Sequence, residues 1–198
     1  MAAPAAADKR RVILDAAVRV FARQGFHTCR VSDIADEARV AYGLVYHYFS
    51  SKEEILDTLF LERWELMLEA ISQADAEQPT APEKLYAIAA FIVDSYRYDP
   101  ELMKVIIVEV TRAANTFGRT HLGKIREAYD RITEIVERGQ AEGVFRAEID
   151  SAFAALAFYG LIEQVLTGWI FESEPVAEER LERAKALIVD TICRGLDS

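Results

Sequence analysis

Hydroxyl and imidazole side chains are concentrated in one short stretch of the sequence, YGLVYHYFSSK, which covers residues 42–52. Tyr42, Tyr46 and His47 can donate hydrogen bonds to phosphate oxygens or to the edges of bases. Gly43 has no side chain, so it permits a close approach of the backbone. These residue types are suited to contact with a nucleic acid, whereas the competing interpretation is that the tyrosines pack and His47 is solvated.

The spacing of this stretch separates two faces if it forms a helix. At about 100° per residue, the four residues just named fall on one face. The opposite face carries the stripe Val45, Tyr48 and Phe49, which we expect to pack on neighbouring helices. Lys52 follows at the expected start of the next helix, where free backbone amides and a cation suit a phosphate.

Three helices must hold that face in place. Apolar residues repeat with helical spacing from Ile13 to Phe21, and Gly25 then ends this first helix. The pattern continues in two short segments, 31–38 and 42–49, which are separated by RVA. Two short helices with a first helix packed across them form a helix-turn-helix, whose second helix enters the major groove of DNA.

The remainder of the chain is also predicted to be helical, which makes the expected fold class all-α. Ser51 and Glu54 have the spacing of a capping box, and they open a long helix to about residue 74. The stretch AEQPTAP is the clearest linker, and Asp150 is a candidate N-cap. The further predicted helices lie near 82–98, 100–115, 119–142, 150–172 and 176–195. The expected domains are a disordered tail at 1–8, a three-helix helix-turn-helix domain at 9–51 and, joined to it by the long helix, a helical domain at 52–198.

The charge of the chain is divided unevenly between its two parts. The net charge is −10, yet residues 1–50 carry seven Lys and Arg against five Asp and Glu, which leaves +2 there and −12 in the rest. A small polyanion-binding module on an acidic body fits this contrast. The two cysteines have no metal-type spacing and favour a reducing intracellular setting. The longest apolar run, at 152–162, is too short to span a bilayer, and the N-terminus does not resemble a signal peptide.

These stretches together resemble a known family. Residues 10–56, with ILDAAVRVFARQGF, VSDIADEARV and YGLVYHYFSSKEEIL, are similar to the DNA-binding region of the TetR family of bacterial repressors. The sequence departs from the usual family pattern at Arg39, where a turn glycine is usual, and at Ala41, where a capping serine is usual. The residues expected at the DNA are Arg30, Ser32, Tyr42, Gly43, Tyr46, His47 and Lys52.

The resemblance also implies that the helical part after residue 51 binds a ligand and forms dimers. The 153–171 segment is apolar nearly all round, so it must be covered on both sides, and the last helix carries a second apolar stripe. We expect these two helices of each protomer to form a two-fold, four-helix interface, whereas a monomeric core is the alternative. A palindromic operator favours the dimer, because the two reading heads must lie about 34–36 Å apart. The expected interface residues are Phe158, Ile162, Val165, Trp169, Leu181, Ala184, Ile188 and Ile192.

Core packing accounts for most of the aromatic residues on the predicted helices, and we expect a subset of them to line a large apolar pocket with few polar groups. The stretches VEVTRAANTFG, GQAEGVFRAEID and YGLIEQVLTGWIF are similar to the C-terminal domains of TetR-type fatty-acid-degradation repressors, which bind long-chain acyl-CoA and release DNA. Such a ligand needs an apolar tunnel and cations for its phosphates. Basic residues, Arg126 among them, cluster around the predicted turn at 116–123, although surface salt bridging would also explain them. The expected ligand-binding residues are Trp64, Phe91, Glu109, Arg112, Asn115, Phe117, Arg119, Lys124, Tyr129, Tyr159 and Gln164.

Other function classes compete with a repressor. An enzyme is disfavoured, because the sequence has no nucleophile elbow, no phosphate-binding loop and no paired metal ligands, and no cofactor is expected. A multidrug-type sensor would bind flat or cationic drugs and ignore CoA thioesters. A DNA-independent helical interaction protein would be unaffected by loss of the Tyr46 and His47 face. The expected partners are double-stranded operator DNA, a small hydrophobic effector and a second copy of the chain, in the cytoplasm at the nucleoid and without a membrane.

Overall fold

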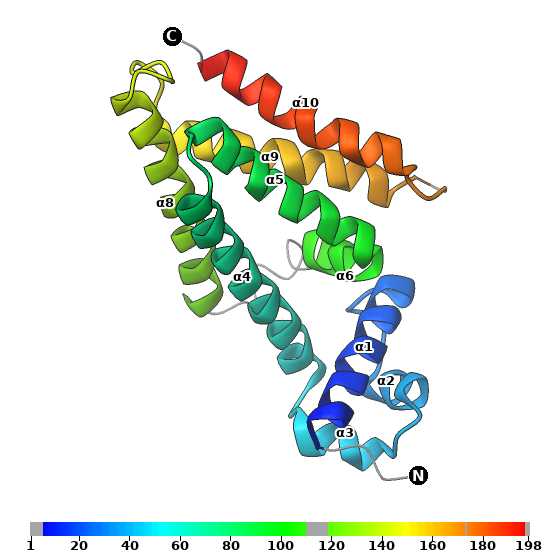
Figure 1. Ribbon diagram of the computed structural model, residues 1–198. Coiled ribbons are helices and arrows are strands. Elements are labelled where there is room, and N and C mark those ends of the chain that lie inside the picture. Colours follow the sequence, from blue (N-terminus) through cyan, green and yellow to red (C-terminus); the bar gives the residue numbers. More distant parts are fainter. Residues whose placement is uncertain (1–5, 110–118, 173, 197–198) are drawn as a thin grey trace. The chain divides into compact units, whose positions relative to one another are not determined.

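The structure, a computed structural model, describes residues 6–109, 119–172 and 174–196; at 6–8, 109, 119–121 and 196 it describes the backbone alone. The regular elements of these residues are helices, which confirms the predicted all-α class (Figure 1). They are α1 (Ala6–Gln24), α2 (Val31–Ala38), α3 (Tyr42–Tyr48), α4 (Lys52–Glu77), α5 (Ala81–Tyr98), α6 (Pro100–Lys104), the π-helix η1 (Val105–Glu109), α8 (Arg119–Ala141), α9 (Ser151–Ile170) and α10 (Glu178–Leu196).

The chain folds as two compact units. The first unit contains the described residues up to Glu62 and those from Glu101 to 109, and the second contains the other described residues. Helix α4 begins in the first unit and continues in the second. A disordered tail was expected at residues 1–8, but α1 begins at Ala6, so residues 6–8 are helical. The expected domain boundary after residue 51 stays a prediction.

Helices α1, α2 and α3 of the first unit enclose one apolar core. Ile13, Ala17 and Phe21 of α1 are buried, and α2 packs against α1 with Ile34 buried as well. Gly25 follows α1 with φ = 81°, a left-handed conformation that favours glycine, and its amide donates to the carbonyl of Phe21 at 2.9 Å. The first helix therefore ends where the sequence predicted.

Helix α3 separates its two faces as its spacing predicted. Val45 is fully buried, Phe49 directly after the helix is buried, and Tyr48 packs half-buried against the same core. The residues that stay exposed on the other face are Tyr42, Gly43, Tyr46 and His47.

A carboxylate ties α1 to α2. Glu37 accepts hydrogen bonds from Arg19 Nε at 2.7 Å and from Arg23 Nη2 at 3.1 Å. These bonds, that of Arg19 first, hold the pKa of Glu37 below its usual value. The link therefore contributes stability at pH values above the usual pKa of a glutamate. This stability is lost as the pH falls through the lowered pKa of Glu37.

The turn between α2 and α3 contains a left-handed residue that is not glycine. Arg39 has φ = 54° and ψ = 45°, and the amide of Val40 donates to the carbonyl of Ala35 at 3.0 Å. This arrangement closes the end of α2. An L side chain in this conformation brings its Cβ close to the backbone, which glycine avoids. The departure from the family pattern at this position is thus a strained one.

Replacing Arg39 by glycine is expected to stabilise the first unit. Removing the Cβ relieves the strain of the left-handed conformation, whereas glycine increases the entropy of the unfolded chain. We expect the first effect to be larger, so that the free energy of unfolding rises by about 0.5–1 kcal/mol. Urea denaturation of Arg39→Gly, Arg39→Ala and the parent chain measures this, with no gain expected for alanine, which keeps the Cβ. A glycine variant that is less stable than the parent would contradict the strain.

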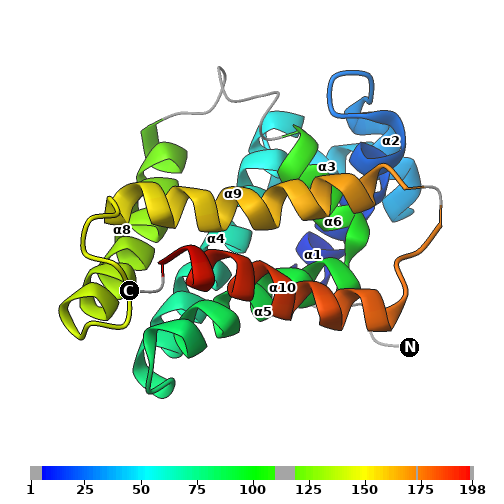
Figure 2. The ribbon, with the colours of Figure 1, turned by 90° about the horizontal axis from the view of Figure 1, so that it is seen from above.

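Helices α5, α8, α9 and α10 form the packed body of the second unit. Helix α9 contacts α8, α5 and α10, and Figures 1 and 2 show α9 and α10 side by side. Asp150 caps α9 by accepting from the amide of Phe153 at 2.6 Å, as predicted. Thr80 and Glu83 form a capping box at the start of α5, inside the stretch that was expected to be a linker.

A buried lysine joins α10 to α5. Lys185 is 4% exposed, and its Nζ donates to Asp94 Oδ1 at 2.8 Å and to Glu182 Oε1 at 2.6 Å. Burial alone would lower the pKa of Lys185, but the two carboxylates outweigh it and raise the pKa above its usual value. The charge is therefore kept and fixes α10 on α5.

Helix α9 is long and apolar enough to cross a membrane, judged by length and composition alone. The apolar run at 152–162 alone is too short to span a bilayer, but the helix that contains it continues to Ile170. One such helix is weak evidence for membrane insertion, since the central helix of a globular unit has the same composition. In this unit α9 packs against three other helices.

Candidate nucleic-acid interface and interior site

The outward face of α3 presents two neighbouring tyrosines. Tyr42 and Tyr46 are 53% and 45% exposed, and their ring centroids lie 5.1 Å apart. The Tyr42 hydroxyl donates to the Tyr46 hydroxyl across 3.1 Å, which leaves the proton of Tyr46 for an external acceptor. A Cβ added at Gly43 would meet nothing within 4 Å. The face can therefore donate hydrogen bonds and lets another backbone come close.

A surface depression of the first unit adjoins this face. The starts of α2 and α4 and the side of α3 form its walls, and the amide of Arg30 donates to Asp33 Oδ2 at 2.7 Å at the start of α2. At the start of α4, Ser51 accepts from the amide of Glu54 at 3.2 Å, whereas the Glu54 carboxylate accepts from the amide of Ser50 at 2.6 Å, so half of the predicted capping box forms. Hydroxyl groups, a guanidinium and helix starts in one depression suit a phosphate. The predicted DNA-binding residues that line it are Arg30, Ser32, Tyr42, Tyr46 and Lys52.

The ammonium group of Lys52 is already engaged within the first unit. Its Nζ donates to the carbonyl oxygens of Phe26 at 2.8 Å, of Cys29 at 3.1 Å and of His27 at 3.4 Å. It also lies 4.7 Å from the centroid of the Phe26 ring. Lys52 therefore holds the turn between α1 and α2, and a direct contact with phosphate stays a prediction.

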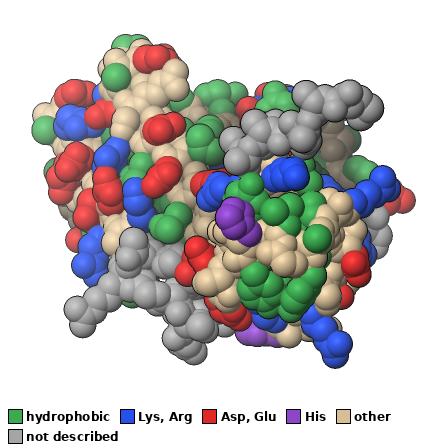
Figure 3. Space-filling view, turned by 90° about the horizontal axis from the view of Figure 1, so that it is seen from below, with side chains coloured by type: hydrophobic (Ala, Val, Ile, Leu, Met, Phe, Trp, Pro, Cys, Tyr) green, Lys and Arg blue, Asp and Glu red, His purple; other side chains and the backbone are tan. Residues whose placement is uncertain are grey.

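Apolar, basic and acidic side chains lie near a histidine in one view of the surface (Figure 3). Figure 3 shows hydrophobic side chains, among which tyrosines are counted, around a histidine, with Lys and Arg side chains nearby. Apolar and hydrogen-bonding groups flanked by cations are the composition of a surface that reads base edges between phosphate contacts.

Aromatic side chains from separate helices meet inside the second unit. Trp64 of α4 lies 5.8 Å from Tyr159 of α9 between ring centroids, and Tyr159 lies 5.5 Å from Tyr129 of α8. Phe91 of α5 carries the guanidinium of Arg63 over its ring at 4.6 Å. Three of the predicted ligand residues are therefore joined by ring contacts. The fourth, Phe91, contacts Arg63, which precedes Trp64 in the sequence.

Two charged residues of this interior were missed from the sequence. Burial lowers the pKa of Arg63 and raises the pKa of Glu163, which follows Tyr159 by one turn. Neither side chain has a hydrogen bond or an ion pair within the described part of the chain. Burial also raises the pKa of Tyr129 to about 12, and that of Tyr159 further still. A sequence signal existed for Glu163, because it is the one charged residue of α9.

Other predicted ligand residues lie elsewhere or outside the described structure. Gln164 is exposed and faces a groove between α9 and α10, not the aromatic interior. Lys124 Nζ lies 3.5 Å from Glu65 Oε1, as the salt-bridge alternative supposed. Glu109 and Arg119 are described by their backbone alone. The predictions that lie outside the described residues are Arg112, Asn115 and Phe117.

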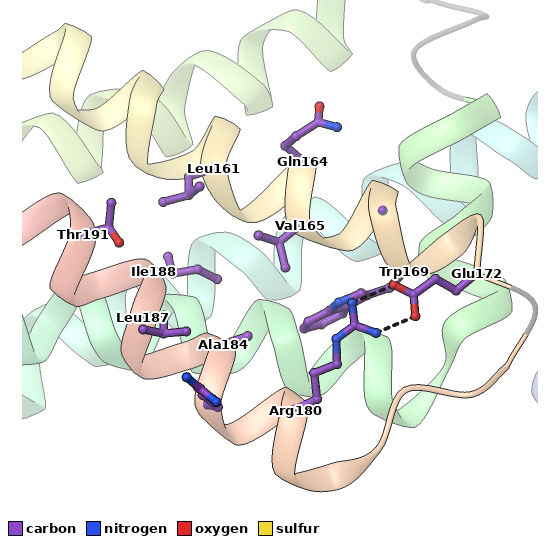
Figure 4. A pocket seen from close by; sticks show the side chains of 12 residues that line it. Leu161, Gln164, Val165, Trp169, Glu172, Arg180, Ala184, Leu187, Ile188 and Thr191 are labelled. Atoms are coloured by element: carbon purple, nitrogen blue, oxygen red, sulfur yellow. Dashed lines mark hydrogen bonds and ion pairs between the residues drawn. The ribbon is translucent and has the colours of Figure 1, made fainter.

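The groove between α9 and α10 has a volume of about 520 Å³ and an apolar floor. Figure 4 shows Val165 of α9 above Ile188 and Ala184 of α10, with Arg180 paired to Glu172 at one end. Leu187, half exposed, lies on the same groove. The exposed apolar surface of α9 continues beyond it at Phe153 and Leu156.

Burial within the protomer differs among the expected interface residues, and the interface itself stays a prediction. A side chain that is covered within its own protomer has no surface left for a second chain. Trp169 is also mostly covered, and Ile192 is half-buried, whereas Val165 and Ala184 line the open groove. Ile188 is mostly covered but lines the groove, and the expected interface residues that lie only in the core of the protomer are Phe158, Ile162 and Leu181.

Metal binding has no support in the part of the chain that the structure describes. No group of three or more His, Cys, Asp or Glu side chains lies close enough together there to hold an ion.

The sequence matches two family descriptions. Residues 13–59 match "Bacterial regulatory proteins, tetR family", and residues 82–192 match "Tetracyclin repressor-like, C-terminal domain". The chain is 32% identical over 163 residues to a fatty acid metabolism regulator protein of Bacillus subtilis, covering 82% of this chain and 84% of that protein. It is 33% identical to the HTH-type transcriptional repressor NicS of Pseudomonas putida, over 75% of this chain and 71% of NicS.

Solved structures of similar proteins share the fold. The fatty acid degradation regulator FadR from Bacillus halodurans superposes with a TM-score of 0.81 at 28% identity, covering 99% of this chain and 98% of that one. FadR from Bacillus subtilis in complex with stearoyl-CoA also gives a TM-score of 0.81, at 26% identity over 94% of this chain and 98% of that one.

Proposed function

The chain belongs to the tetR family of bacterial regulatory proteins, and from this premise we propose how this member works. It is a transcriptional repressor and not an enzyme, as its relatives are. It binds a palindromic operator as a homodimer, at the nucleoid in the cytoplasm, and a long-chain acyl-CoA releases it. The observation that carries this proposal is the exposed Tyr42–Tyr46 pair on α3, beside a depression suited to phosphate.

The DNA contacts follow from the geometry of the first unit. Tyr46 and His47 face base edges in the major groove, and Gly43 lets the backbone approach. Arg30 and Ser32 contact phosphates from the depression. These phosphate contacts set the position of α3 in the groove, and the base contacts set the sequence.

The second copy of the chain occupies the groove between α9 and α10. Its floor is apolar, and half-exposed Leu187 would face water in an isolated protomer. Gly160 and Gly168 of α9 have open space where a side chain would begin, so another helix can approach closely. A two-fold axis through this surface makes the same patch serve both protomers, which closes the dimer without leaving a free face.

The effector occupies the aromatic interior of the second unit. Trp64, Tyr129 and Tyr159 supply apolar surface for an acyl chain, and Arg63, which has no ion pair within the described residues, supplies a cation for an oxygen atom of the ligand. The FadR of Bacillus subtilis, which shares this fold, has been solved with stearoyl-CoA. In one state of the dimer the two α3 helices fit adjacent major grooves, and in the other they do not. Release requires that the effector binds the second state more tightly than the first, by a few kcal/mol.

A mobility-shift titration tests this function. The protein first selects an operator from randomised duplexes, and stearoyl-CoA, stearate, free CoA and a flat cationic dye are then added separately. We expect release by stearoyl-CoA and by none of the others. Binding that persists at saturating stearoyl-CoA would remove the acyl-CoA assignment, and failure to select any palindrome would remove the operator assignment.

Arg63→Met is expected to weaken stearoyl-CoA binding at least about tenfold, because a hydrogen bond to a charged group is worth about 1.5–3 kcal/mol. Calorimetry on the free protein measures this. Arg146→Met removes an arginine that pairs with Glu148 at the surface, and this control should bind the ligand as the parent does. Equal affinity in all three proteins would place the ligand away from Arg63.

A multidrug-type sensor is the second candidate, and Glu163 is the observation that favours it. The half-buried carboxylate of Glu163, one turn from Tyr159, would attract a flat cation, just as Arg63 would attract an anionic oxygen. The two functions separate by variant. Glu163→Gln should abolish binding of the cationic dye if the protein is a drug sensor, and it should leave stearoyl-CoA binding within about threefold of the parent if the first function holds.

A further inference from the structure

Lys104, the last residue of α6, caps a helix that lies far away in the sequence. Its Nζ donates to the carbonyl oxygen of Ala22, in the last turn of α1, at 2.8 Å. The carbonyls in the last turn of a helix lack partners within that helix, and they carry its partial negative charge. A cation at this place therefore both satisfies a backbone acceptor and complements the helix dipole.

This use of a lysine is unusual within the chain. The protein is acidic, and lysines such as Lys84 and Lys185 pair with carboxylates. Among the described residues, no carboxylate lies within ion-pair distance of Lys104. Lys52 is used in the same way, on three carbonyls of the turn that follows α1. The ammonium groups of Lys104 and Lys52 thus hold the last turn of α1 and the turn that follows it, respectively.

The segment that carries Lys104 belongs to the first unit. Val105 is fully buried in the core that α1, α2 and α3 enclose, and Leu102 packs against that core. Directly after Lys104 the chain changes from α-helical to π-helical geometry over η1. Short π-helical stretches are rare and are often found at functional sites. The cap therefore sits at a junction between two helical geometries.

We propose that Lys104 is a positioning residue for operator recognition. By holding the last turn of α1, it fixes the helix on which α2 packs, and α2 in turn supports α3. This role rests on the proposed DNA-binding function, and it adds a residue that contacts neither DNA nor effector.

Lys104→Met keeps the apolar stem and removes the cap, whereas Lys104→Arg keeps a donor. The control is Glu101→Gln, which changes an exposed charge of α6 in the same turn. Amide exchange without DNA should accelerate about tenfold around residues 22–29 in Lys104→Met, because a charge-assisted hydrogen bond is lost. The arginine variant and the control should exchange as the parent does.

Operator affinity is then measured well below the thermal midpoint of each variant. We expect Lys104→Met to bind the selected operator about tenfold more weakly, with the arginine variant within about threefold of the parent. The affinity of Lys104→Met for non-specific duplex, and the salt dependence of its binding, should equal those of the parent. A salt slope reduced by about one would show a direct phosphate contact instead.

The outcomes separate the two claims. Unchanged exchange at residues 22–29 in Lys104→Met overturns the cap, whether or not the parent selects any DNA. Accelerated exchange with unchanged operator affinity overturns the positioning role. A parent protein that selects no operator removes the proposed function, and with it the role of Lys104 in recognition, while the exchange result still decides the contact itself.

Discussion

Replacing both Tyr42 and Tyr46 by alanine is expected to abolish specific operator binding, with a loss of at least about 100-fold. Each side chain that contacts a base or phosphate contributes about 1–3 kcal/mol, and a two-fold dimer loses every contact twice. The fold should be unaffected, because both rings are about half exposed and the core face of α3 is untouched. Mobility-shift or anisotropy titration with the selected operator measures the loss.

Tyr98→Ala is the matched control for this prediction. Tyr98 is 77% exposed and belongs to the second unit, so its removal deletes an exposed tyrosine without touching α3. The control should bind as the parent does. If the double variant also binds as the parent does, with unchanged circular dichroism, then the polar face of α3 does not read DNA and the repressor acts through another surface.

Leu187→Asp is expected to convert the dimer to monomers and, as a consequence, to abolish operator binding. The two-fold axis places one new carboxylate on each protomer inside an apolar interface, and transferring an ion out of water costs several kcal/mol even after relaxation. A monomer has a single head, so the gain from binding both half-sites at once is lost. Sedimentation velocity measures the first effect and the operator titration the second.

Leu66→Asp controls for the introduction of a charge. Leu66 has the same 50% exposure as Leu187, lies on α4 and does not line the groove between α9 and α10. This variant should stay dimeric. A Leu187→Asp protein that sediments as a dimer would show that the second copy binds elsewhere, and the groove would then be free for another partner.

The candidate DNA site was predictable because its geometry is local. The two faces of α3 follow from seven consecutive residues, and the start of α4 follows from the serine and glutamate at 51 and 54. The left-handed Arg39 could not be predicted with equal ease, since the family pattern favours glycine there. Lys52 also differs from expectation, because the position of the turn at 26–29 next to α4 is a tertiary fact.

The interior site was predictable only as a set of candidates. Aromatic residues on α4, α5, α8 and α9 are equally good candidates by composition, and only packing brings Trp64, Tyr129 and Tyr159 together. Arg63 was overlooked because an arginine in a helix usually faces solvent, whereas here its guanidinium lies on the ring of Phe91. Glu163 and Gln164 are neighbours in sequence, yet a rotation of 100° sends them to different surfaces.

The sequence by itself determined the helices, most of their ends and the two faces of α3, because hydrogen-bond caps and helical periodicity act over three to eight residues. Only the tertiary structure decided which apolar residues of α9 and α10 stay open to a second chain, since a helix that is apolar all round carries no record of what covers each side. It also decided that Lys104 caps α1 and that Lys52 holds the turn after α1, because those contacts join residues separated by more than twenty positions.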